Sequence, residues 1–207
     1  MSLIVSESKK IELIPEGVQL AVCQALIDVG EQYSQKFDKW SRKVVVIWEL
    51  PNVKGVDQEG KEYARKVSRE YTAFLGEKTN LEKDLNSWRG KSFTAEERKA
   101  FDLRTILNVG CQIQIIHKEK ERGTYSEISG IMALPAGMKV EPTGQSYVFD
   151  IEDESTWSNF GNIPQWIQEK IYASKEYPTS KLKEFLEKND IVAQWQPVAV
   201  GDEKLPF

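Results

Sequence analysis

The sequence is poor in the residues that build metal sites and nucleophilic active sites. Among its 207 residues there are two cysteines, Cys23 and Cys111, and one histidine, His117. Zinc sites and nucleophile–base pairs need several such side chains brought together. We therefore predict no metal ion and no catalytic residue, and we interpret both cysteines as small core residues, since each lies in an apolar stretch.

Long hydrophobic runs and glycine-rich phosphate loops are also absent. The longest uninterrupted apolar run spans only residues 44–48, and residues 1–7 lack a secretory hydrophobic segment. Neither a Walker loop nor a Gly-x-Gly-x-x-Gly motif occurs. These absences predict a soluble cytoplasmic protein with no membrane contact, no cofactor and no nucleotide hydrolysis.

Acidic side chains are in slight excess, and they are unevenly distributed. Residues 1–134 carry 21 basic and 20 acidic side chains, whereas residues 135–207 carry 7 and 12. Residues 36–69 hold 9 basic and 5 acidic side chains. A nearly neutral body with a local basic excess can still bind an anion.

Alternating apolar residues predict five strands between residues 17 and 134. The first strand changes parity after Val22, which predicts a bulge. The second is expected over Lys43–Leu50, where Pro51 would end it, and the third over Tyr63–Phe74. In the last two strands we expect these side chains to point inward: Cys111, Ile113, Ile115, His117, Ile128, Met132 and Leu134.

Helix signals follow the third strand. Thr79 or Asn80 is expected to begin a helix that Gly90 ends, and Thr94 opens a capping box for a second, shorter helix. A helix between the third and fourth strands matches the element order of the OB-fold. We therefore predict a mainly β (α+β) protein: an OB-fold five-stranded barrel with helical additions.

Two more helices are expected in the C-terminal third, at about residues 164–173 and 179–189, after a short strand at 147–149. They predict a C-terminal helical annex, packed on the barrel through Trp166, Ile167, Ile171, Leu182 and Phe185. The predicted organisation is an N-terminal arm (1–16), the OB-fold barrel (17–138), the annex (139–190) and a tail (191–207).

The strongest local signal for function lies between the first two strands. There, aromatic and basic side chains interleave: Tyr33, Lys36, Phe37, Lys39, Trp40, Arg42 and Lys43. Cations neutralise a phosphate backbone, while aromatic rings stack on unpaired bases at about 1–3 kcal/mol each without reading sequence. The alternative is that Phe37 and Trp40 bury into the mouth of the barrel and the lysines are ordinary surface residues.

The third strand supplies a second basic group, Arg65, Lys66 and Arg69, which we assign to the same nucleic-acid-binding face. In the alternating pattern of this strand, Arg65 and Arg69 fall on the same face as the apolar residues. Alternation alone does not explain why two arginines lie on that face. The acidic run at residues 150–154 is more typical of a solvated loop, or of a phosphate mimic that competes for the basic face, than of a metal-dependent nuclease. Such an enzyme needs carboxylates that converge from different elements.

The last residues combine an acidic run with an apolar end: Asp202, Glu203, Lys204, Leu205, Pro206 and Phe207. This pattern suits a partner pocket that takes the Phe ring while a basic side chain meets the carboxylate. It resembles the acidic Pro-Phe tails of bacterial single-stranded-DNA-binding proteins, which recruit replication and repair partners. The alternative is that Leu205 and Phe207 dock on the protein's own core.

Several segments also resemble a family of tailed-phage proteins encoded in replication or recombination modules. They are residues 68–72, 77–81, 84–90, 93–94 and 133–138, and Leu-x-x-Asp-Leu-x-Ser-Trp-Arg-Gly is the most specific run. The resemblance covers about residues 15–172 and implies an OB-fold single-stranded-DNA-binding protein. Within it, we expect Trp88 to be a core residue and Arg89 to cap the C-terminus of its helix.

The resulting hypothesis is a non-enzymatic phage protein of the bacterial host cytoplasm. It would bind and protect single-stranded DNA without sequence preference, and recruit replication or recombination proteins through Asp202, Glu203, Leu205, Pro206 and Phe207. The alternative is an OB-like protein-interaction or structural phage module that binds no nucleic acid. The residues do not distinguish DNA from RNA, and they leave open whether the chain forms a homodimer.

Overall fold

The computed structural model describes residues 12–57, 59–120 and 123–189. Three long strands come first: β1 (Gly17–Ser34), β2 (Lys39–Val56) and β3 (Glu62–Thr72). They are followed by α1 (Asn80–Arg89), α2 (Ala95–Lys99), the 3₁₀ helix η1 (Leu103–Ile106), β4 (Gly110–Lys120) and β5 (Gly123–Met132). The C-terminal part contains β6 (Tyr147–Phe149), η2 (Glu154–Asn162), α3 (Gln165–Tyr172), η3 (Tyr177–Thr179) and α4 (Lys181–Lys188).

The strands form one mostly antiparallel sheet in the order β3-β2-β1-β4-β5, and β6 pairs with β1 in parallel. Among the described residues no ladder joins β3 to β5, so the sheet is not closed into a barrel. The α1 helix contacts both of these edge strands. The expectation of a β-rich fold with helices is confirmed at this level, whereas a closed barrel is not.

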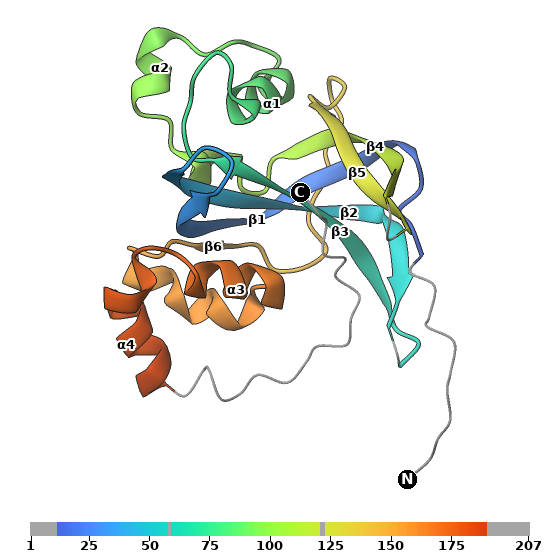
Figure 1. Cartoon of the computed structure of the whole chain (residues 1–207). Helices are drawn as coiled ribbons and strands as arrows, with labels where there is room; N and C mark the ends of the chain where they lie inside the picture. The colour runs from blue at the N-terminus through green and yellow to red at the C-terminus, as the bar shows by residue number, and fades with distance from the viewer. Residues whose placement is uncertain (1–11, 58, 121–122, 190–207) are drawn as a thin grey trace.

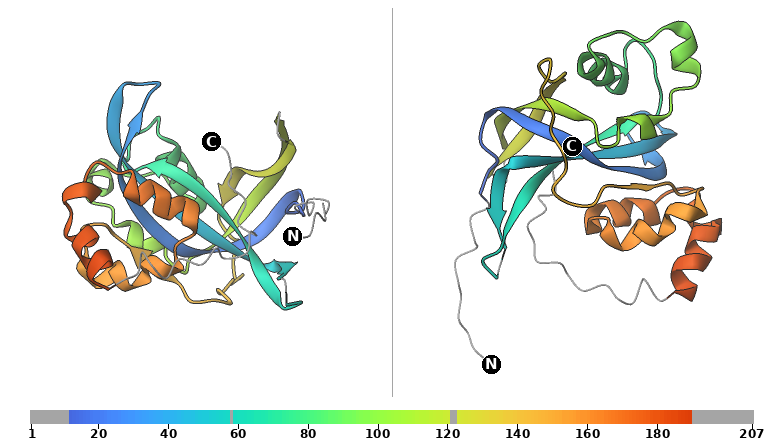
Figure 2. Two further views of the ribbon diagram at one scale, coloured as in Figure 1. Left: turned by 60° about the horizontal axis from the view of Figure 1, so that its bottom comes forward. Right: turned by 180° about the vertical axis from the view of Figure 1, so that it is seen from behind.

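Helices cover both faces of the sheet (Figures 1 and 2). The α1 side holds one core, which includes Leu26, Trp48 and Trp88. The other core lies between the opposite face and the C-terminal helices, and it includes Ile27 and Ile47. The middle parts of β1 and β2 are therefore buried on both faces.

The predicted contacts of the C-terminal helices are confirmed. Ile167, Ile171 and Leu182 are fully buried in the second core, and Trp166 and Phe185 pack against it while partly buried. The short strand at 147–149 is also present. The division of the chain at residues 16, 138 and 190 stays a prediction.

The local signals for helix ends and the first bulge are confirmed as well. Thr79 caps α1, Gly90 ends it in the left-handed region with a φ of 69°, and Thr94 forms the capping box of α2. The register of β1 shifts between Cys23 and Ala25, where the parity changes. Both cysteines are free and buried, as expected.

Two expectations about the strands are wrong, and bulges explain both of them. The β2 strand continues past Pro51 to Val56, because its register shifts after Leu50 and the ladder resumes at Lys54. In β5 a shift at Ser129 turns Ile131 inward, so Met132 is exposed and does not point into the core. The third strand, expected roughly over Tyr63–Phe74, is present as β3 and ends two residues earlier, at Thr72.

One side chain differs from its expected position, and another has contacts beyond its expected role. His117 is not in the core; its Nε2 lies 2.7 Å from the carbonyl oxygen of Ile14. Arg89 lies in the last turn of α1, but its guanidinium forms an ion pair with Glu97 and stacks 4.0 Å from the centre of the Phe93 ring. It therefore ties α1 to α2.

Candidate nucleic-acid interface

The β1–β2 hairpin presents three aromatic rings at its tip. Tyr33, Phe37 and Trp40 are 48%, 64% and 41% exposed. Tyr33 and Trp40 are cross-strand partners, with ring centroids 5.4 Å apart and ring planes tilted by 52°. The tip projects beyond the rest of the sheet in Figure 2, left. Phe37 and Trp40 are therefore not buried, contrary to the alternative interpretation.

Polar contacts hold the tip in shape. Asp38 adopts a positive φ of 47°, which closes the turn, and the Phe37 amide donates to the carbonyl oxygen of Ser34 at 3.2 Å. The Tyr33 hydroxyl donates to the Asp38 carboxylate, and this hydrogen bond raises the pKa of Tyr33 above its ordinary value. The rings are thus carried by an ordered turn whose tyrosine stays protonated at neutral pH.

Lysine side chains lie beside these rings. The ammonium groups of Lys36 and Lys39 are 5.5 and 6.0 Å from the centre of the Phe37 ring. Lys175, which follows α3, lies 6.0 Å from the centre of the Trp40 ring and 3.2 Å from a carboxylate oxygen of Glu31. Rings and cations occur together at the tip, as stacking on a charged single strand requires.

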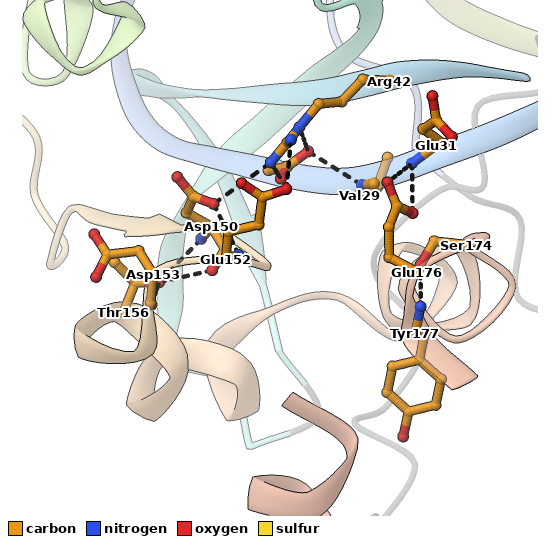
Figure 3. A network of polar contacts seen from close by, with 12 residues as sticks. Val29, Glu31, Arg42, Asp150, Glu152, Asp153, Thr156, Ser174, Glu176 and Tyr177 are labelled. Carbon is orange, nitrogen blue, oxygen red and sulfur yellow. Dashed lines mark hydrogen bonds and ion pairs between the residues drawn. The ribbon is translucent and has the colours of Figure 1, made fainter. Parts of the chain in front are cut away.

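Arg42 is engaged by carboxylates rather than free. Its guanidinium lies 2.6 Å from Asp28, 2.9 Å from Glu152 and 3.7 Å from Asp150 (Figure 3). Burial raises the pKa of Asp28, although the hydrogen bond and charge of Arg42 oppose that rise. We predicted that the positive charge of Arg42 binds DNA, but in the structure this charge is compensated by carboxylates of the protein itself.

The remaining predicted cations are distributed along β2 and β3. Lys43 donates to the Thr72 hydroxyl at 2.8 Å, and Arg65 donates to the carbonyl oxygen of Glu12. Lys66 is exposed. Arg69 forms an ion pair with Asp84 at 2.7 Å inside the gap between β3 and β5. The structure does not bring these four residues together with the hairpin tip.

The C-terminal helices limit which surface is accessible. They cover the outer face of β1 and β2, where Val45 and Ile47 lie in the second core. Lys170 of α3 reaches over β3 and pairs with Glu70 at 2.7 Å. The exposed part of the candidate interface is therefore the hairpin tip with the side chains beside it, together with Lys66 on β3.

The acidic run at 150–154 lies against two arginines. Besides Arg42, Arg104 of η1 lies 3.3 Å from Asp150 and 3.0 Å from Asp153. The hydrogen bonds of Ser155, and then Arg104, lower the pKa of Asp153. In the described part of the chain no group of three or more His, Cys, Asp or Glu side chains is arranged to hold a metal ion.

Sequence reasoning missed Lys175 and Arg104. No local pattern marks either residue, because each reaches the site only through tertiary packing of a distant segment. The predicted tail residues Asp202, Glu203, Leu205, Pro206 and Phe207 lie outside the described residues.

No model of a known protein family matches the chain, and no curated protein matches it. The resemblance to tailed-phage proteins thus stays a prediction. Within the described residues, no helix is both long and apolar enough to cross a membrane.

Proposed function

We propose that the protein binds single-stranded DNA through the tip of the β1–β2 hairpin. Tyr33, Phe37 and Trp40 would stack on unpaired bases, and Lys36 and Lys39 would neutralise the adjoining phosphates. The observation that carries the proposal is the exposure of all three rings, with lysine ammonium groups within 6.0 Å of the centres of two of them, Phe37 and Trp40. Because ring faces accept any base, binding would be tolerant of sequence.

The strand order supports the same proposal. The order β3-β2-β1-β4-β5, with α1 between β3 and β4, matches the order expected for an OB-fold, although no ladder joins β3 to β5 among the described residues. OB-folds bind oligonucleotides with the face of strands 2 and 3 and the loops that follow strands 1 and 4. Here the hairpin tip corresponds to the first of these loops. Lys43, Arg65 and Lys66 would extend the interface weakly, whereas Arg69 would act in the fold.

The test is a titration of dye-labelled oligo-dT at several salt concentrations. Removal of Trp40 (W40A) should weaken binding by about 1–3 kcal/mol, since one stacking platform is lost. The double variant K36A/K39A should flatten the slope of log K against log salt by about 1.4, at about 0.7 per phosphate contact.

The matched control is K83A/K188A, which removes two exposed lysines from α1 and α4. It should leave the slope nearly unchanged. If the wild-type chain shows no salt-sensitive binding at low ionic strength, the proposal is wrong. Parallel titrations with double-stranded DNA and single-stranded RNA measure the preference for DNA.

A protein-interaction module is the second candidate function. It is favoured by the engagement of Arg42 and Arg69 in internal ion pairs, which leaves less free positive charge for a nucleic acid. In that case the exposed rings would fill a groove of a partner protein. W40A would then abolish a stable protein complex while oligonucleotide binding, if any, stays unchanged.

The tail is proposed to recruit replication or recombination proteins. Asp202 and Glu203 would supply negative charge, and Leu205, Pro206 and Phe207 the apolar end. A chain that ends at Val200 should lose the partner and bind DNA more tightly, because the acidic residues no longer compete for the basic face. Unchanged partner capture by the shortened chain contradicts this role.

A further inference from the structure

Two arginines from different elements lie on either side of one carboxylate. Arg42 of β2 is 3.7 Å from one oxygen of Asp150, and Arg104 of η1 is 3.3 Å from the other. Arginine forks match phosphate oxygens as well as they match carboxylate oxygens. A carboxylate shared between two guanidinium groups therefore occupies the position that a phosphate group would take.

This arginine pair is continuous with the hairpin tip. Trp40 and Arg42 are two residues apart on β2, so both side chains lie on the same face of that strand. Their cross-strand partners on β1 are Tyr33 and Glu31. A single strand stacked on the ring of Trp40 and running toward the sheet meets Arg42 next.

The acids that cover the arginines come from a turn at the surface. Glu152 is 67% exposed, Asp153 34% and the shared Asp150 29%. Exposed ion pairs of this kind are screened by water and salt and contribute little net stability. Asp28 differs, since its side chain is only 14% exposed and stays with Arg42 as part of the sheet.

We propose that Arg42 and Arg104 form a phosphate-binding site for the DNA backbone, and that the turn at residues 150–153 occupies it as an internal phosphate mimic. The inference rests on the proposed function. It adds Arg104 to the interface and gives the acidic turn a role: DNA binds fully only when its phosphates displace Asp150, Glu152 and Asp153 from the two guanidinium groups.

The test neutralises the turn without changing its shape. In D150N/E152Q/D153N each carboxylate becomes an amide of the same size, and the amide oxygen at position 153 can still cap η2 as the Asp153 carboxylate does. Oligo-dT should bind about three- to tenfold more tightly at low salt, and the salt slope should steepen by about 0.7 for each arginine released. If the triple variant does not fold, the double variant E152Q/D153N can be used instead, and we expect it to change affinity and salt slope in the same direction.

Two controls separate a site from a general charge effect. E141Q/E184Q/E187Q removes three exposed carboxylates elsewhere and should leave the slope as in the wild type. Adding R104Q to D150N/E152Q/D153N should remove the part of the gain that Arg104 supplies and flatten the salt slope by about 0.7. A gain that R104Q leaves undiminished, or no gain at all, overturns the inference.

The outcomes also separate the inference from the proposed function. Suppose that the wild type binds oligo-dT and that W40A weakens this binding. If D150N/E152Q/D153N then binds with the same affinity as the wild type, only the inference has failed. If neither the wild type nor the neutralised turn binds oligo-dT, both have failed. Binding by D150N/E152Q/D153N alone, dependent on Arg104, contradicts the proposed function of the wild-type chain but supports a phosphate site at the two arginines that the turn keeps closed.

Discussion

The guanidinium of Arg69 on β3 donates a hydrogen bond to the carbonyl oxygen of Ile128 on β5, across the gap between the two edge strands. The same side chain pairs with Asp84 of α1, which also accepts from the Tyr71 hydroxyl at 2.7 Å. Burial lowers the pKa of Arg69, but Tyr71 and Asp84 outweigh it and leave the pKa raised. Arg69 thus fastens the open side of the sheet.

Replacing Arg69 should destabilise the fold rather than act on DNA directly. R69M leaves the carboxylate of Asp84, only 18% exposed, without its cation. We expect a loss of about 2–4 kcal/mol in the free energy of unfolding, measured by urea titration. The control K66M removes an exposed cation from the same strand and should cost less than about 0.5 kcal/mol. Equal costs for the two variants would contradict the role of Arg69.

Gly30 should be far less tolerant of substitution than Gly60, although both have positive φ values, +70° and +83°. A Cβ atom at Gly30 would lie 2.8 Å from Cβ of Ser174, whereas nothing lies within 4 Å of one at Gly60. G60A should cost about 1–2 kcal/mol for the left-handed backbone alone. G30A should cost about 1–3 kcal/mol more, through overpacking against the segment after α3. Thermal or urea unfolding of both variants measures the difference.

The capping box of α2 should make stability depend on acid pH. The Thr94 amide, and then the Arg89 side chain, lower the pKa of Glu97 below its ordinary value of 4.5. The stabilisation is therefore complete above pH 4.5 and is lost as the pH falls through the lower folded-state pKa. E97Q should be less stable than the wild type at pH 7, with a smaller loss below pH 4.5. The control E96Q changes an exposed neighbour, and an identical pH profile for both variants would contradict the assignment.

The two thiols should report on opening of the sheet. Cys23 and Cys111 are fully buried on β1 and β4, and burial raises the pKa of both thiols. Since the thiolate is the reactive form, a disulfide reagent at pH 8 should label the folded protein only as fast as the sheet opens. Urea should make labelling rapid. Immediate labelling of both cysteines in the folded protein would show that the core is not closed around them.

The features that the sequence predicts correctly depend on neighbours along the chain. The caps at Thr79, Gly90 and Thr94 follow from turn chemistry within a few residues. The inward alternation of Cys111, Ile113 and Ile115 follows from the two-residue period of a strand. Exposure of the aromatic tip is compatible with the sequence but is not fixed by it, because a loop can also fold back on the core.

The features that could not be predicted depend on tertiary packing or on bulges. The shift at Ser129 adds one residue to β5 and reverses the parity that its apolar residues suggest. The partners of Arg42 and Arg69 come from distant segments, so the net charge of a local run did not reveal that these cations are compensated. Arg104 was missed for the same reason.

The middle parts of β1 and β2 are buried on both faces, so the alternation of polar and apolar residues does not specify the register in which these two strands pair. A slip of one residue would exchange one apolar face for another, so the usual penalty for burying polar groups is weak in this section. Polar contacts at its two ends supply the missing information: Gln24 donates to Glu49 at 2.5 Å at one end, and Arg42 pairs with Asp28 at the other. The register of the buried section is thus specified at its two ends, by the few polar side chains there that form specific hydrogen bonds and ion pairs.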